Sequence, residues 1–175
     1  CGVGIIQEGQ GFVSLGTSGV LLTARSECNP LAESAVHTFC HALPNTWYQM
    51  GVILSATDSL NWLSSIIGRS PSQLTAELND KIDGPSLEKF YPYLSGERTP
   101  LNDAHIRGGF AGLSTTSTAI KLTQAVMEGV AFALCDCLEA LKKAGPCPEQ
   151  LLAIGGGTRS RYWLETIATS LNNYI

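Results

Sequence analysis

Glycine-rich turns are the segments of this sequence best suited to chemistry. Gly155–Gly157 follow the apolar run Leu151–Ile154, and either Thr158 or Ser160 can begin the helix that comes next. Glycines let a ligand lie directly against the main chain, and a helix N-terminus offers unpaired N–H groups that suit a phosphate. The spacing matches neither the Walker pattern nor the dinucleotide fingerprint. A phosphate-binding turn and a plain strand-to-helix turn therefore both remain open at this point.

A second glycine turn lies near the start of the chain. The runs Phe12–Leu15 and Val20–Thr23 read as strands, and Gly16, Thr17, Ser18 and Gly19 between them predict a hairpin. The tip of such a hairpin offers backbone N–H groups and two hydroxyls with little side-chain bulk. Such a run of donors can hold a phosphate, although this turn taken alone favours a plain hairpin turn.

The elements that must position these turns follow from the hydrophobic periodicity. Two further strands are predicted at residues 35–43 and 47–53, and a helix from Ser55 to Gly68. The longest helix is capped by Ser117 or Thr118 and runs to about Lys143, with one buried stripe. Because no linker or repeat separates these elements, we expect residues 1–175 to form a single domain. Its fold class is α/β.

An aromatic run leads into a loop that contains two adjacent charged residues, Glu97 and Arg98. Loops that carry fixed aromatic and charged residues often carry function. A pair that only ties the loop to the rest of the domain is the alternative.

The composition excludes several classes of protein. The 175 residues carry a net charge of −4, with 44% hydrophobic and 15% charged residues and no basic run, which argues against a nucleic-acid surface. No apolar stretch is long enough for a membrane span. Six scattered cysteines, without a C-x-x-C pair, predict small buried thiols in a reducing cytoplasm and no metal site.

Taken in order, these motifs resemble the C-terminal domain of the FGGY family of carbohydrate kinases. The segments that carry the resemblance are Ser14–Val20, Tyr93–Pro100, Arg107–Leu113, Val126–Gly129 and Ile154–Ser160, which together extend over nearly the whole chain. Each motif is weak alone, whereas their order and spacing are specific. Within the family, the run Tyr93–Pro100 is most like the xylulokinase branch.

The resemblance implies an actin-like (ribonuclease H-like) ATPase fold with ATP and Mg²⁺ as cofactors. It implies that Gly16, Thr17 and Ser18 of the hairpin turn face the terminal phosphates, and that Gly156 and Gly157 lie against the adenosine and phosphates. It also implies that Ser160 and Arg161 lie near the base or ribose, and that Asn61 is a polar residue near the nucleotide.

The resemblance also implies what this chain lacks. The family's catalytic base, an Asp, would lie upstream of Cys1, so no catalytic residue is expected here, and the C-terminal domain is expected to be truncated at both ends. The implied partners are the N-terminal domain of the same protein and a sugar, D-xylulose. A sibling kinase acting on ribulose, gluconate or glycerol and a non-catalytic nucleotide-binding fragment remain alternatives, and a homodimer remains open.

Overall fold

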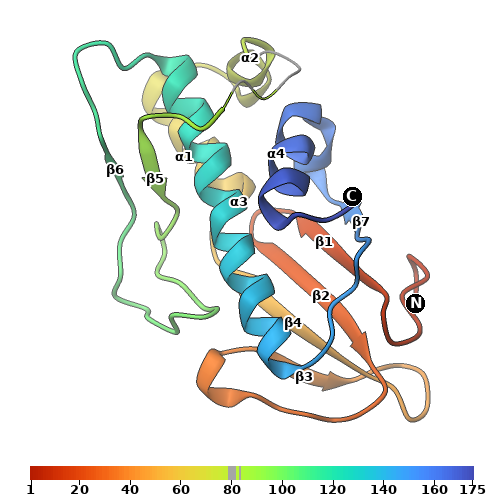
Figure 1. Cartoon of the computed structure of the whole chain (residues 1–175). Coiled ribbons are helices and arrows are strands. Elements are labelled where there is room, and N and C mark those ends of the chain that lie inside the picture. Colours follow the sequence, from red (N-terminus) through yellow and green to blue (C-terminus); the bar gives the residue numbers. More distant parts are fainter. Residues whose placement is uncertain (79–81, 83) are drawn as a thin grey trace.

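The larger sheet of the computed structural model has five strands and lies against a long central helix (Figure 1). The structure describes residues 1–78, 82 and 84–175. The strand order is β3-β4-β2-β1-β7. The strands are β1 (Gly11–Leu15), β2 (Gly19–Arg25), β3 (His37–Cys40), β4 (Trp47–Ile53) and β7 (Leu152–Ile154). The strand expected at residues 35–43 is shorter than predicted, because Ala35 adopts a left-handed conformation that ends a 3-10 turn, η1 (Ala32–Ser34).

Strand directions bring three strand ends to one side of the sheet. β1 is antiparallel to β2, β2 is antiparallel to β4, and β7 is parallel to β1. Strands β1, β4 and β7 therefore run the same way, and they end at Leu15, Ile53 and Ile154. We call this side of the sheet the carboxyl edge. Both predicted glycine turns start there.

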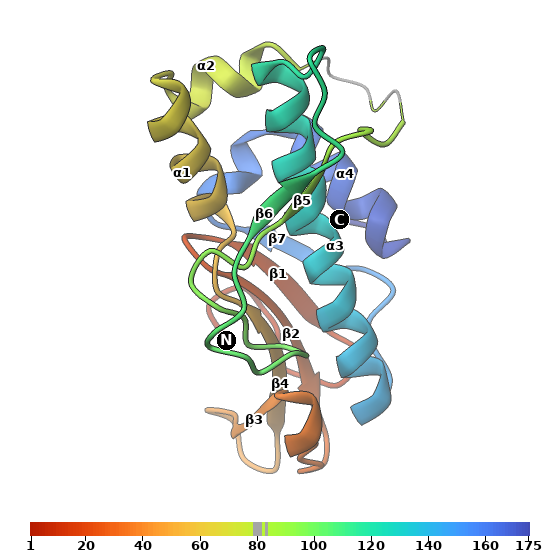
Figure 2. The same cartoon turned by 90° about the vertical axis from the view of Figure 1, so that its left-hand side faces the viewer.

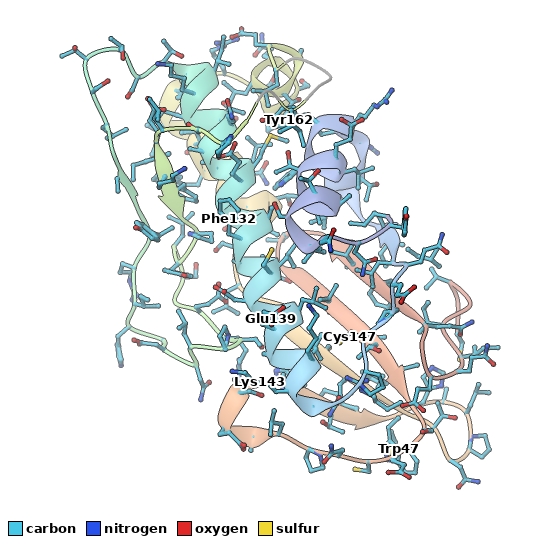
Figure 3. All side chains as sticks on the ribbon, viewed as in Figure 1. Trp47, Phe132, Glu139, Lys143, Cys147 and Tyr162 are labelled. Carbon is cyan, nitrogen blue, oxygen red and sulfur yellow. The ribbon has the colours of Figure 1, made fainter. Side chains whose placement is uncertain are left out.

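Helix α3 (Ala119–Ala144) packs across the sheet, and α4 (Arg161–Leu171) lies beside it (Figure 1). The Thr118 hydroxyl caps α3 by accepting a hydrogen bond from the Lys121 amide. The buried Trp163 indole joins the two helices, because its Nε1 donates to the Met127 carbonyl at 3.0 Å. On the opposite side, α3 exposes Phe132, Glu139 and Lys143, which Figure 3 shows along the helix.

Two shorter helices continue from the end of β4. Helix α1 (Thr57–Ile67) starts three residues beyond Leu54, and α2 (Pro71–Ala76) follows it. Helix α2 begins with a capping box, in which Ser70 and Gln73 satisfy each other's backbone N–H groups. Figure 2 shows α1 and α2 together at one end of the molecule. Their position places them next to the carboxyl edge.

Strands β5 (Lys89–Tyr91) and β6 (Gly109–Ala111) form a separate two-stranded sheet alongside α3 (Figure 2). Phe90 and Phe110 face each other across this sheet and stack with Trp62 of α1. The aromatic cluster therefore fixes the two-stranded sheet against the helices. In the described part of the chain, no helix combines the length and the hydrophobicity needed to cross a membrane.

Candidate functional site

The two glycine turns lie side by side at the carboxyl edge. Ser14 of β1 pairs with Ile154 of β7, so the chain leaves both strands at the same level. The contact continues one residue further on, because a β-carbon on Gly155 would lie 2.5 Å from the Leu15 carbonyl oxygen. Gly155 also has a φ of 98°, which L side chains rarely adopt. Glycine at this position is what allows the two turns to touch.

The first turn, Gly16–Ser18, is oriented by the start of α1. The Gly16 carbonyl accepts a hydrogen bond from the Thr57 amide at 3.0 Å, and the Thr17 carbonyl accepts one from the Ala56 amide at 2.8 Å. In a planar trans peptide, the C=O and the following N–H point in opposite directions. The amides of Thr17 and Ser18 therefore point away from α1. They form two backbone donors that an anion could reach, and Thr17 itself is exposed.

The second turn folds into a short 3-10 helix, η2 (Gly156–Arg159), before α4 begins. A β-carbon on Gly156 would meet no atom within 4 Å, whereas one on Gly157 would lie 2.8 Å from the Leu15 β-carbon. Gly156 therefore borders open space and Gly157 is packed. Of the two predicted caps, Ser160 is the residue that caps α4, since its hydroxyl accepts from the Trp163 amide at 3.3 Å.

A cavity of about 550 Å³ opens between α1, α2 and the second turn. Its size falls within the usual range for small-molecule sites. Its described lining combines backbone, hydroxyl and amide groups, one cation and apolar carbon, and includes no carboxylate. The lining residues are Thr57, Leu60, Asn61, Pro71, Ser72, Thr75, Gly156, Gly157, Arg159, Ser160 and Trp163. Such a lining is compatible with a ligand that has a flat apolar part and an anionic part.

Four of the residues predicted from sequence line this cavity, namely Asn61, Gly156, Gly157 and Ser160. Gly16, Thr17 and Ser18 do not line it; they border it through Thr57, which contacts Gly16 and also lines the cavity. Arg161 lies outside the lining, and its Nε donates to Glu165 at 2.8 Å. The cation in the lining is Arg159.

Sequence reasoning missed the wall that α2 contributes, Pro71, Ser72 and Thr75. The Ser-Pro start of this helix was readable from the sequence, but nothing in the sequence indicated that it would face a turn more than eighty residues further along the chain. Thr57 was also missed. The position of Thr57 between the end of β4 and the expected helix was the available signal.

The Glu97 side chain fastens its loop to the end of β4. Its Oε1 accepts from the Leu54 amide at 3.0 Å and from the Arg98 amide at 2.7 Å. Thr99 extends this attachment by exchanging hydrogen bonds with Val52. Of the two interpretations of the loop, the structure shows the one in which Glu97 ties it down.

The environment of Glu97 is unusual for a carboxylate. The residue is 3% exposed, and its Oε2 has no partner in the described part of the chain. Burial therefore raises the pKa of Glu97, the hydrogen bonds from Arg98 and Leu54 oppose the shift, and the nearby Asp136 adds to it.

The cysteines differ in part from expectation. All six are free thiols, but Cys1, Cys28 and Cys40 are exposed rather than buried, because they lie in peripheral segments outside the core; only Cys137 is fully buried. Burial raises the pKa of the Cys137 thiol. Among the described residues, no group of three His, Cys, Asp or Glu side chains is placed to hold a metal ion.

Comparisons with known proteins agree with this architecture. Residues 11–174 match the C-terminal domain model of the FGGY family of carbohydrate kinases. The chain is 41% identical over 168 residues to a xylulose kinase from Escherichia coli (strain K12), covering 95% of the chain and 35% of that protein. The chain thus spans about a third of the length of the curated relatives it matches.

Comparison with solved structures also finds sugar kinases that match nearly the whole chain. A xyloylose kinase from Brucella ovis matches with a TM-score of 0.95 and 56% identity, covering 97% of the chain and 35% of that structure. A gluconate kinase from Lactobacillus acidophilus matches with a TM-score of 0.80 and 26% identity, covering 98% and 35%. The mixed α/β architecture is therefore that of the actin-like ATPase domain of these kinases.

Proposed function

Since the chain belongs to the FGGY family of carbohydrate kinases and corresponds to its C-terminal domain, we propose that the full-length protein phosphorylates a sugar with ATP. The substrate we propose is D-xylulose, which would be converted to D-xylulose 5-phosphate. Relatives that carry the name xylulose kinase support this choice. The observation that carries the proposal is the contact between the two glycine turns beside one cavity.

In this proposal the two turns hold opposite ends of the nucleotide's phosphate chain. The outward amides of Thr17 and Ser18 donate to the terminal phosphates, and the bare main chain at Gly156 lets the ligand approach without a β-carbon in the way. Backbone donors held in place before the reaction need little reorganisation as charge moves. Phosphoryl transfer depends mainly on such alignment.

The cavity would hold the adenosine. Asn61 and Ser160 lie in its lining, where they can bond the base or ribose, and we propose that Arg161 borders the same end. ATP supplies the phosphoryl group, and Mg²⁺ supplies neutralising charge on the phosphate oxygens. The described lining contains no carboxylate that would repel the phosphates at the end of the cavity beside Gly156.

The remaining machinery would come from the rest of the full-length protein. We propose that an Asp there accepts the proton of the sugar 5-hydroxyl, whose oxygen then attacks the γ-phosphorus. Closure of the two domains would exclude water, which otherwise competes with the sugar. Residues 1–175 alone would then show no sugar phosphorylation. Cytoplasmic location is part of the proposal, and free thiols are compatible with it.

The test is a substrate panel on the full-length protein, with ADP formation as the readout. We expect the highest kcat/KM with D-xylulose. A higher value with ribulose, gluconate or glycerol would instead identify a sibling kinase, an alternative that the gluconate kinase match favours. Nucleotide binding without turnover on any of these sugars would identify a non-catalytic protein.

A further inference from the structure

Thr57 contacts both glycine turns at once. Its backbone amide and its Oγ1 both donate to the Gly16 carbonyl, at 3.0 Å and 2.8 Å. Its methyl carbon Cγ2 lies 3.2 Å from the position that a β-carbon on Gly157 would take. The side chain also lines the cavity. One residue therefore lies between the two segments that are proposed to hold the nucleotide.

The start of α1 explains why this contact matters. Ala56 precedes the helix and provides no side-chain cap. The first amides of the helix are bonded instead by the turn, since Ala56 and Asp58 donate to the Thr17 carbonyl and Thr57 donates to the Gly16 carbonyl. The carbonyls of the turn accept hydrogen bonds from amides at the start of the helix that would otherwise lack a partner. The same hydrogen bonds fix the orientation of the turn.

The Thr57 hydroxyl adds a second bond to the Gly16 carbonyl. The peptide that carries this carbonyl also carries the Thr17 amide, which points the opposite way. Two donors on one carbonyl hold the peptide plane more firmly than one does. Without the hydroxyl, only the Thr57 amide holds this carbonyl, so the plane can tilt more freely and the direction of the Thr17 amide is less fixed.

We propose that Thr57 is a positioning residue that sets the orientation of the Gly16–Ser18 turn. Its hydroxyl holds the Gly16 carbonyl, and thereby directs the Thr17 amide outward. The inference rests on the proposed function, because the oriented amide is assigned to the phosphates. It makes Thr57 act through the main chain and not through its own contact with phosphate.

The experiment compares ATP with adenosine, using Thr57→Val in the full-length protein. Valine keeps the branched shape and the methyl group and removes only the hydroxyl. Loss of one neutral hydrogen bond is expected to weaken ATP binding by about fivefold and to lower kcat by about tenfold. Adenosine has no phosphates, so its affinity should change by less than about twofold.

Two further variants separate positioning from stability. Thr57→Ser keeps the hydroxyl, so it should restore the wild-type ratio of ATP to adenosine affinity. Thr123→Val is a matched control, because that buried hydroxyl also donates to a backbone carbonyl at 2.8 Å, in α3. It should shift the unfolding temperature without changing the affinity ratio.

The outcomes distinguish this inference from the proposed function. A wild-type protein that binds neither ATP nor adenosine would overturn both. A wild-type protein that binds ATP, together with a Thr57→Val variant of unchanged ratio and kcat, would overturn the inference alone. Equal loss of ATP and adenosine affinity in Thr57→Val, or a serine variant that behaves like valine, would also overturn it.

Discussion

The turn after β1 and the turn after β7 both contain two kinds of glycine, one beside open space and one in close contact with its neighbours. In the first turn, a β-carbon on Gly16 would meet only an ordinary contact at 3.5 Å, whereas one on Gly19 would lie 2.6 Å from Ile53. In the second turn, Gly156 faces open space, whereas Gly155 is blocked by Leu15. An open glycine, Gly16 or Gly156, therefore lies beside glycines that packing requires, which are Gly19 at the start of β2 and Gly155 and Gly157 in the second turn.

This difference separates residues that build the fold from residues that can meet a ligand. A glycine held by close contact is explained by the chain itself. A glycine beside open space has no such explanation, and at Gly156 the open space belongs to the 550 Å³ cavity. The open glycines are therefore the ones whose substitution should affect binding and leave stability unchanged.

The largest effect is expected at Gly155. Gly155→Ala forces a side chain into a φ of 98° and against the Leu15 carbonyl oxygen at 2.5 Å. We expect the free energy of unfolding to fall by at least about 3 kcal/mol. Urea titration measures this loss. Gly156→Ala is the matched control and should change stability by less than about 0.5 kcal/mol; equal losses in the two variants would remove the distinction between packed and open glycines.

The second-largest effect is expected on ATP binding, at Gly156. Gly156→Asp places a carboxylate beside the phosphates that are proposed to lie between Gly156 and Thr17, and like charges at close range repel. We expect ATP affinity to fall by about 100-fold, which corresponds to about 2.7 kcal/mol. Calorimetric titration of the full-length protein measures it. Gly156→Asn has nearly the same shape without the charge and should lose much less; unchanged ATP affinity in the aspartate variant would count against the assignment.

A smaller effect is expected at Gly19. Gly19→Ala places a methyl group against the Ile53 side chain, which can move, unlike the backbone oxygen that faces Gly155. We expect a loss of about 1–2 kcal/mol in unfolding free energy. Gly16→Ala serves as its control, because a β-carbon there meets only the 3.5 Å contact. A loss at Gly16 as large as at Gly19 would show that the first turn is packed throughout.

The smallest effect concerns the support of the first turn. Glu97 accepts a hydrogen bond from the Leu54 amide, and the Ala56 amide, two residues later, donates one to the Thr17 carbonyl. Because burial raises the Glu97 pKa above its usual 4.5, the folded state binds this proton more tightly than the unfolded state. The stability that protonated Glu97 contributes is therefore fully present below the usual pKa. It is lost as the pH rises through the raised pKa of the folded protein.

Glu97→Gln removes this titration while keeping a side-chain oxygen that can accept from Leu54. The stability of the wild type should fall relative to that of the glutamine variant as the pH is raised from about 4 to about 7. Urea midpoints of the two proteins across this range measure the difference. A difference that stays constant with pH would show that Glu97 has an ordinary pKa in the folded protein.

Much of the fold could be predicted because it depends on local patterns. The alternation in β1 and β2, the stripe on α3 and the glycines after β7 each indicated the right element. The joining of the turns could also be predicted, but only from the family resemblance. The α2 wall and the role of Thr57 could not, because they depend on how α1 and α2 pack against a distant turn. No local pattern encodes that packing.

The same limit applies to the charged loop. The sequence left open whether Glu97 acts in function or holds the loop, since adjacent charges fit both. The hydrogen bonds from the Leu54 and Arg98 amides show that Glu97 holds the loop, and they depend on the segment 97–99 lying along the free edge of β4 beyond the end of β3.

A crystal structure of the full-length protein with Mg²⁺ and a non-hydrolysable ATP analogue tests the central claim most directly. The account predicts the adenosine in the cavity lined by Asn61 and Ser160, and the phosphates between the Thr17 amide and Gly156. An analogue bound elsewhere, or one whose phosphates point away from both turns, would contradict it.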